Sequence, residues 1–311
     1  MNFWFTIKKP ILALAPMAGY TDSAFRLICR QIGSDVVYSE MISTDAIVFK
    51  NKKTIRMLKY SSKECPLIFQ LFGNKPERFK EAVIFLNKKL KNKKNIGIDI
   101  NFGCPAHKVT KTGSGAALMN ELDTAYKIIN AVCKNTDLPV SIKVRTKVKN
   151  TTCLEFAETV KNLPISAMMI HGRSLKQGFS GNIDFATIKK VKQILPDKIV
   201  LANGGVDSLE TALKTLSATC CDGLGLARGV LGNPWLFASI RQNKKNNPPP
   251  DEIKKMIICH AELFLQDNEN LINLRKHFVR YIHKQKNASA LRQRLVNVEN
   301  LDELKKILKD L

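Results

Sequence analysis

The stretch IGIDINFGCPAH, residues 96–107, decides how the rest of the chain is organised. Isoleucines alternate through its first five residues after a lysine-rich run, which predicts a short buried strand. The strand carries Asp99 and Asn101 and then turns into Cys104. Residues 108–115 continue as a polar, glycine-punctuated loop. Taken alone, Cys104 is a buried structural cysteine near a turn. A functional role for Cys104 is favoured only if the other predicted strands also end in polar or reactive side chains.

Seven further apolar runs have the length and composition of strands. Helical segments separate them, such as residues 76–93, where Phe79, Val83 and Leu86 fall on one face. This alternation predicts a (β/α)8 TIM barrel. An open doubly wound sheet is the alternative, but no GxGxxG fingerprint follows the first strand. The eight predicted strands cover residues 11–15, 36–41, 66–72, 96–100, 139–145, 166–172, 198–205 and 223–229.

The alternation stops at residues 244–250, where an asparagine pair and three consecutive prolines indicate a linker. Only helical sequence follows, near residues 251–266, 270–286, 288–296 and 302–310. We therefore predict a barrel domain, residues 1–243, and a small all-helical domain, residues 244–311. The second of these helices favours an anion-binding face, although a solvated surface is the ordinary fate of such a charge run. Its basic side chains are Arg275, Lys276, His277, Arg280, His283, Lys284 and Lys286.

The chain of 311 residues is strongly basic, with 50 Lys and Arg against 27 Asp and Glu and a formal net charge of +23. Such a charge attracts polyanions, including nucleic acid. A lysine-rich proteome with solvated lysines is the plainer explanation, and the many asparagines beside the lysines support it. Whether the protein binds nucleic acid therefore depends more on where the basic residues lie than on the total charge.

The eight cysteines include no CxxC pair and no His/Cys cluster with zinc spacing. This usage is typical of a reduced, cytoplasmic protein and predicts no metal site. The apolar run after Lys9 is too short for a signal peptide. No run reaches the length of about 20 apolar residues that a bilayer span needs, so no membrane partner is expected.

Polar and cationic residues gather where the predicted strands end. In a TIM barrel the carboxyl ends of the strands form the active-site face. Each residue has a structural explanation of its own, but eight strand ends on one rim favour a single pocket. In chain order the ends carry Pro16 with Met17, Glu40, Gln70, Asn101 with Cys104, Lys143 with Arg145, His171 with Arg173, Asn203 with Gly204, and Ala227 with Arg228.

The last two strands have the composition of a phosphate site. They end in NGG, residues 203–205, and GLARG, residues 225–229. Small residues let backbone N–H groups approach a phosphate, the next helix favours its charge, and Arg228 can bind it. Gln70 and Lys143 could hydrogen-bond the edge of a flat heteroaromatic ring. Because no side chain in this set performs redox chemistry alone, a bound cofactor would supply it.

Six motifs together resemble the signature of the tRNA-dihydrouridine synthases. The NxGCP motif is the most specific of them, and the resemblance covers nearly the whole chain. LRKH, residues 274–277, and the basic residues after it are most similar to the bacterial B-type branch. The six motifs are PMAGYTD at 16–22, NFGCP at 101–105, KVR at 143–145, HGR at 171–173, NG at 203–204 and LGNPW at 231–235.

The resemblance implies an FMN-binding barrel and a helical tRNA-binding domain in a cytoplasmic enzyme. It implies reduction of the C5=C6 bond of uridine in tRNA to 5,6-dihydrouridine, with NADPH as electron donor. No nicotinamide-binding motif separates NADPH from NADH. A hydride would pass from reduced FMN to C6, and Cys104 would protonate C5, since a thiol of pKa about 8.5 keeps its proton at neutral pH. A monomer is the default expectation.

The resemblance also implies a role for each site residue. Contacts to the flavin fall to Pro16, Met17, Ala18, Gln70, Lys143 and His171. The phosphate would be held by Asn203, Gly204, Gly205, Ala227 and Arg228, and the substrate nucleotide would face Asn101, Arg145 and Arg173. The loop 106–115 would close over the bound uridine.

The chain departs from the family pattern at two positions. Gly205 stands where relatives commonly have an acidic residue, and Ala227 stands where a glycine usually precedes the arginine. A methyl group at 227 is compatible with a bound phosphate if φ stays negative.

Two other functions fit part of the sequence. A flavin barrel for a small molecule, of the dihydroorotate- or enoate-reductase type, would not need the basic helices. A tRNA-binding or chaperone-like protein with a vestigial pocket would not need the complete set of Cys, Lys, His and Arg.

Overall fold

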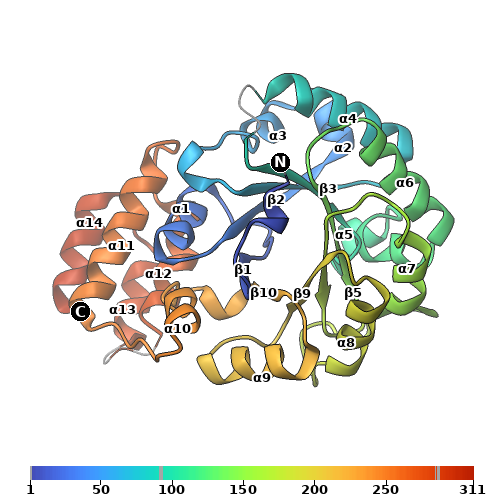
Figure 1. The fold of residues 1–311 in the computed structure, drawn as a ribbon. Helices are drawn as coiled ribbons and strands as arrows, with labels where there is room; N and C mark the ends of the chain where they lie inside the picture. Colours follow the sequence, from blue (N-terminus) through green and yellow to red (C-terminus); the bar gives the residue numbers. More distant parts are fainter. Residues whose placement is uncertain (1, 91–93, 284, 286–287) are drawn as a thin grey trace.

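The computed structural model describes residues 2–90, 94–283, 285 and 288–311 of the chain. Eight parallel strands close into a barrel in the order β1-β10-β9-β8-β5-β4-β3-β2, which confirms the predicted TIM barrel (Figure 1). The eight predicted runs all form strands of this barrel. Their bounds are β1 (Ile11–Leu14), β2 (Val36–Ser43), β3 (Leu67–Phe72), β4 (Ile96–Asn101), β5 (Val140–Arg145), β8 (Ala167–His171), β9 (Ile199–Asn203) and β10 (Gly223–Leu226).

Helices surround the barrel and bury their apolar stripes against it. In α4 these are Phe79, Val83 and Leu86, as the helical spacing predicts. The helix ends at Lys89, and the remainder of the predicted helix 76–93 reaches residues 91–93, which lie outside the described residues. The barrel helices are α1 (Ser23–Ile32), α2 (Thr44–Val48), α3 (Lys52–Arg56), α4 (Pro76–Lys89), α5 (His107–Thr110), α6 (Leu122–Lys134), α7 (Cys153–Val160), α8 (Phe185–Ile194), α9 (Leu209–Thr219) and α10 (Leu236–Gln242).

The amino-terminal end of the barrel is closed by aromatic side chains. The 3-10 helix η1 (Phe3–Phe5) places Phe3 and Trp4 in one buried cluster with barrel residues such as Ile11 and Tyr38. Trp4 is fully buried. Because this end is filled, an opening for a ligand remains at the carboxyl ends of the strands, the face used by TIM-barrel sites.

In the described part of the chain, four α-helices follow residue 249, and the first of them packs against α1, as the orange and red ribbons of Figure 1 show. Their apolar residues form a second buried cluster, which also contains Ala24 of α1 and Trp235. The predicted boundary between residues 243 and 244 remains a prediction, because this cluster is shared with the barrel. The helices are α11 (Pro250–Leu265), α12 (Arg275–Tyr281), α13 (Ala288–Leu295) and α14 (Leu301–Ile307), with the 3-10 helices η5 (Ile272–Leu274) and η6 (Leu308–Asp310).

Two local predictions need correction. Of the predicted helix 270–286, the described residues form the short η5 and then α12, which ends at Tyr281, while residues 284 and 286 lie outside the described part of the chain. The predicted loop 108–115 contains a helical turn, α5, and leads into the 3-10 helix η3 (Gly115–Asn120).

Short elements without a strong sequence pattern make up the rest. They are the hairpin of β6 (Lys147–Val148) with β7 (Thr151–Thr152) and the 3-10 helices η2 (Ser62–Glu64) and η4 (Arg228–Val230). In the described part of the chain, the helices are too short or too polar to cross a bilayer. Those residues also contain no group of three His, Cys, Asp or Glu side chains arranged to hold a metal ion.

Candidate active site

A cavity of about 710 Å³ opens at the carboxyl ends of the barrel strands. This volume suits a flat cofactor together with part of a substrate, since ligand pockets commonly measure about 300–1,000 Å³. Every residue predicted for the site lines the cavity except Arg173. Glu40, which the sequence also placed on the rim, does not line this cavity, and the other predicted strand ends share one pocket.

The loop after β1 brings Pro16, Met17 and Ala18 to the cavity. Within the loop, the Thr21 N–H donates to the Met17 carbonyl at 3.1 Å. From outside, the Glu40 carboxylate of β2 accepts the N–H of Gly19. These bonds hold the loop against the strand ends, so its backbone is fixed before any ligand binds.

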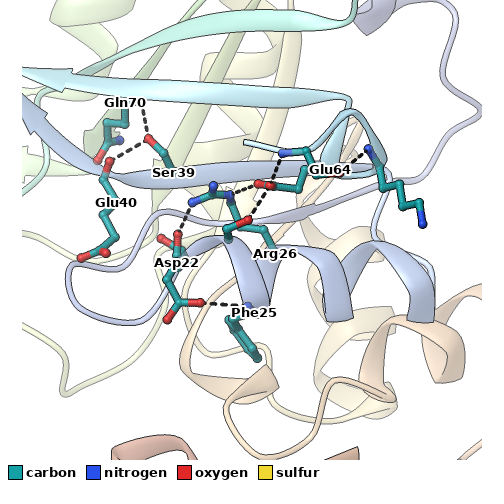
Figure 2. Close-up of polar contacts among 11 residues, drawn as sticks. Asp22, Phe25, Arg26, Ser39, Glu40, Glu64 and Gln70 are labelled. Atoms are coloured by element: carbon teal, nitrogen blue, oxygen red, sulfur yellow. Dashed lines mark hydrogen bonds and ion pairs between the residues drawn. The ribbon is translucent and has the colours of Figure 1, made fainter. Parts of the chain in front are cut away.

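A buried ion pair supports the same loop from behind (Figure 2). The Arg26 side chain of α1 donates to the Thr21 carbonyl at 2.7 Å and to the Glu64 carboxylate at 2.6 Å. Ser23 also donates to Glu64, at 2.6 Å. Both charged side chains are nearly inaccessible, at 4% and 0% exposure. The helix start is fixed as well, because the Asp22 side chain accepts the Phe25 N–H at 3.0 Å.

Cys104 stands on a turn that Asn101 organises. The side-chain oxygen of Asn101 accepts the N–H groups of Gly103 at 3.0 Å and Cys104 at 2.9 Å. The following segment packs against this turn, because the Ala116 N–H donates to the Cys104 carbonyl at 3.1 Å. Gly115 has φ +61°, and a Cβ there would lie 3.2 Å from the Cys104 Cβ. Cys104 is half-buried and lines the cavity.

Behind the turn lies a polar network that the sequence did not assign. The Asn101 amide donates to the Gln70 side-chain oxygen at 2.9 Å, and the Gln70 amide donates to Asp99 at 2.7 Å. Ser141 donates to the other oxygen of Asp99 at 2.7 Å. The signal for this network was the i, i+2 spacing of Asp99 and Asn101, which places both side chains on one side of β4.

The two arginines predicted to face the substrate bind backbone carbonyl groups. Arg145 donates to Gly103 at 2.8 Å and to Gly178 at 2.9 Å, and thereby links the turn of Cys104 with the loop after β8. Arg173 donates to Gly181 at 2.8 Å. Its Nη1 is buried and has no hydrogen-bond partner among the described residues.

Phe179, in the loop after β8, was not predicted. It lines the cavity and is 53% exposed. The guanidinium carbons of Arg228 and Arg145 lie 4.6 and 5.6 Å from its ring centroid. A large aromatic ring between two cations at a cavity mouth is a surface on which a flat ligand can stack.

The ends of β9 and β10 have the geometry of an anion cradle. Gly204 and Gly205 adopt φ +104° and +70°, which side chains rarely adopt, and their backbones line the cavity. Arg228 lies on the same side of the cavity. Ala227 has φ −126°, which lies outside the left-handed region that favours glycine, so a side chain is compatible with this φ.

His171 completes this side of the cavity. Its Nδ1 is buried without a partner in the described part of the chain. A phosphate-bearing flavin such as FMN fits this cradle, because phosphate accepts hydrogen bonds from N–H groups and favours nearby cations.

Positive charge dominates the electrostatics of the cavity. Burial and Arg145 lower the pKa of Lys143 from 10.5 to about 8. Burial and then Lys143, together with three arginines, lower the pKa of His171 to about 2, so its ring is neutral. Burial raises the pKa of Asp99 to about 6. An anionic ligand would offset the repulsion among these cations.

Comparison with known proteins shows the family of the chain. Residues 13–311 match the sequence model of the Dihydrouridine synthase (Dus) family. The chain belongs to the dihydrouridine synthase family. A probable tRNA-dihydrouridine synthase of Helicobacter pylori is 34% identical over 289 residues, covering 91% of this chain and 86% of that protein. The tRNA-dihydrouridine synthase B of Vibrio vulnificus is 32% identical over 295 residues, covering 92% and 90%.

Solved structures support the fold of this family member. Morphinone reductase superposes with a TM-score of 0.53 at 11% identity, over 78% of this chain and 88% of that chain. A 2-naphthoyl-CoA reductase superposes with a TM-score of 0.56 at 10% identity, over 75% and 50%.

The helical unit of this dihydrouridine synthase family member reaches the cavity mouth. Arg280 of α12 lines the cavity, and the Lys276 ammonium lies 5.2 Å from the centroid of the Tyr20 ring, which lines it too.

The predicted anion-binding face is smaller than the sequence suggested. His277 is fully buried, and Arg275 donates to the Val298 carbonyl at 2.6 Å. Lys284 and Lys286 lie outside the described residues.

Proposed function

We propose that the protein reduces uridine to 5,6-dihydrouridine in tRNA as an FMN-dependent synthase, with NADPH as electron donor. The single observation that carries the proposal is the position of Cys104 on the Asn101 turn, inside a cavity that ends in an anion cradle. Membership of the dihydrouridine synthase family supports the substrate. All eight cysteines are free, which supports a reducing, cytoplasmic setting. We further propose that the chain acts as a monomer.

The cradle residues would hold FMN. Asn203, Gly204, Gly205, Ala227 and Arg228 would bind its phosphate, and the cationic surroundings support that assignment. Contacts to the flavin ring would come from Pro16, Met17, Ala18, Gln70, Lys143 and His171. Reduced FMN, when bound, would supply the hydride that adds to C6 of uracil.

Cys104 would donate the proton that C5 receives. Addition at C6 develops negative charge toward C5 and O4, so an acid must stand beside C5. The two N–H bonds to Asn101 fix the backbone of Cys104, which limits where its thiol can point. Lys143 would stabilise the charge that develops on the ring. Arg145 and Arg173 would shape the nucleotide pocket through the loops that they hold.

The target uridine must leave the tRNA stack to reach the cavity, at a cost of a few kcal/mol. Lys276 and Arg280 stand at the mouth, where they would bind the phosphates that flank the flipped nucleotide. A flavin reductase for small molecules would not need cations of a separate helical unit at this point. The surface therefore favours tRNA over the small-molecule alternative.

The direct test uses purified full-length protein, FMN, NADPH and unmodified tRNA transcripts. We expect nucleosides with a mass gain of two hydrogens at uridine, detected by mass spectrometry. The purified protein should carry a flavin absorbance spectrum. Reduction of orotate- or enoate-type small molecules with no change in tRNA would refute the proposal.

Cys104→Ala tests the acid. We expect the rate of tRNA reduction to fall about 10²–10⁴-fold, the usual contribution of general acid catalysis. Flavin binding should persist, because the thiol is not part of the cradle. A Cys104→Ala protein that reduces tRNA as fast as wild type would remove Cys104 from the mechanism.

A further inference from the structure

The Asp99 carboxylate is deeply buried beneath the cavity, and the mechanism above does not use it. It is 0% exposed in the middle of β4. In register it lies beside Gln70 of β3 and Ser141 of β5, and both donate a hydrogen bond to it. Asp99 is thus separated from Cys104 by two side chains, Gln70 and Asn101, which are joined by hydrogen bonds.

We propose that ionised Asp99 is the positioning residue for the proton donor, because it fixes the orientation of two side-chain amides that lead to the Cys104 turn. The assignment of Cys104 as that donor rests on the proposed function. The effect on the turn itself is a property of the folded chain alone.

The argument follows from the direction of each hydrogen bond. An ionised carboxylate only accepts, so the Gln70 NH₂ group must point at Asp99. The Gln70 oxygen then points at Asn101 and accepts from its NH₂ group at 2.9 Å. The Asn101 oxygen is left to accept from the N–H groups of Gly103 and Cys104.

If the side-chain amide of Gln70 were flipped, its NH₂ group would face the NH₂ group of Asn101, and its oxygen would face the Asp99 carboxylate. Reversal of Asn101 would in turn point its NH₂ group at the N–H groups of Gly103 and Cys104. Both reversals leave buried polar groups without partners, which is costly in a site of low dielectric. The charge on Asp99 therefore determines how the Cys104 turn is held.

Protonation of Asp99 removes its charge and places a hydrogen on one of its two oxygens, so one of its two donors, Gln70 or Ser141, loses an acceptor and the other donates to a neutral group. Among the described residues, the polar groups that act on Asp99 are those of Gln70 of β3, Ser141 and Lys143 of β5, and Tyr38 of β2. Burial raises its pKa to about 6, while the bonds from Gln70 and Ser141 and the charge of Lys143 oppose that rise. Asp99 is thus ionised at neutral pH, and it takes up a proton as the pH falls through about 6.

Amide hydrogen exchange on the full-length protein tests the proposal without any activity. The amides of Gly103 and Cys104 should lose protection, on the order of tenfold after correction for intrinsic exchange, between pH 7.5 and pH 5. In Asp99→Asn, protection should be the same at both pH values, because the amide does not titrate. Unchanged protection in wild type, or an equal loss in Asp99→Asn, would overturn the proposal.

The holoenzyme gives a second readout. At pH 7.5 wild type should reduce tRNA about tenfold faster than Asp99→Asn, since a bond to a charged acceptor is stronger than a bond to a neutral one. KM for tRNA should not change. At pH 5 the two rates should converge, and a ratio that is the same at both pH values contradicts the proposal.

Ser141→Ala is the matched control variant, because Ser141 is as fully buried as Asp99. It removes a hydrogen bond that lowers the pKa of Asp99 and leaves the carboxylate in place. The loss of protection should therefore begin at a higher pH than in wild type, and an unshifted midpoint counts against Asp99 as the titrating group. If no variant or wild type reduces tRNA, the proposed function fails, and the exchange experiment still decides the role of Asp99.

Discussion

Removal of the Glu64 charge should destabilise the protein strongly. Glu64 is 0% exposed and accepts from Arg26, Ser23 and the Ser61 N–H at 2.6, 2.6 and 2.7 Å. In Glu64→Gln the new NH₂ group must face a donor, and Arg26 keeps a buried charge without its partner. Breaking a buried ion pair in this way costs about 3–5 kcal/mol.

The assay is urea unfolding followed by circular dichroism, with Asp267→Asn as the matched control. Asp267 pairs with Lys59 at 3.3 Å, but the two side chains are 52% and 69% exposed. An exposed pair contributes about 0–1 kcal/mol, so the control should unfold close to wild type. Both variants remove one negative charge, so the difference between their free energies of unfolding measures the effect of burying the ion pair.

A functional consequence accompanies the loss of stability. Arg26 also binds the Thr21 carbonyl at the end of the loop that carries Pro16, Met17 and Ala18. Under conditions where Glu64→Gln is folded, it should bind FMN more weakly than the control variant. The reasoning is refuted if Glu64→Gln and Asp267→Asn lose equal stability, or if the loss in Glu64→Gln is below about 1 kcal/mol.

Three further predictions concern the site. Asp99→Asn should raise the stability of the protein at pH 7, because burial raises the pKa of Asp99 from 3.8 to about 6 and its ionisation in the folded state therefore costs up to about 3 kcal/mol. In urea unfolding, the midpoint of the wild type should fall as the pH rises from about 4 to about 6, and the midpoint of the variant should not. Gly204→Ala should weaken FMN binding in a fluorescence titration, whereas Gly33→Ala, with a similar φ but away from the cavity, should lower only the unfolding midpoint. Arg280→Ala should weaken tRNA binding and reduce the slope of the logarithm of the binding constant against the logarithm of salt concentration by about one. Lys161→Ala, at the exposed end of α7, is the control and should change neither.

The barrel could be predicted because each of its strands has a local signal. Parallel strands covered by helices are apolar throughout, so runs such as residues 66–72 and 198–205 stand out in the sequence. The residues at the ends of those runs then had to share one rim, which is why most of the site could be named. Cys104 and Gly204 are examples, and both line the cavity.

The basic helix shows where local spacing fails. Arg275, Lys276 and His277 are adjacent in the sequence, and only packing decides their surroundings. His277 enters the buried cluster near Phe25, with ring centroids 4.8 Å apart, because α12 packs against α1. Lys276 instead reaches Tyr20. The number of cations can be read from the sequence, but the orientation of α12 determines which of them lie at the cavity.

By itself the sequence determined the barrel, the rim and the residue types of the cradle, because strand alternation and glycine-rich ends are local properties. Only the tertiary structure decided the partners. Arg145 binds carbonyl groups of two separate loops, and Asp99 reaches the Cys104 turn through Gln70 of a neighbouring strand. A hydrogen bond between strands depends on their register, and register is fixed when the barrel closes rather than by any single stretch of chain.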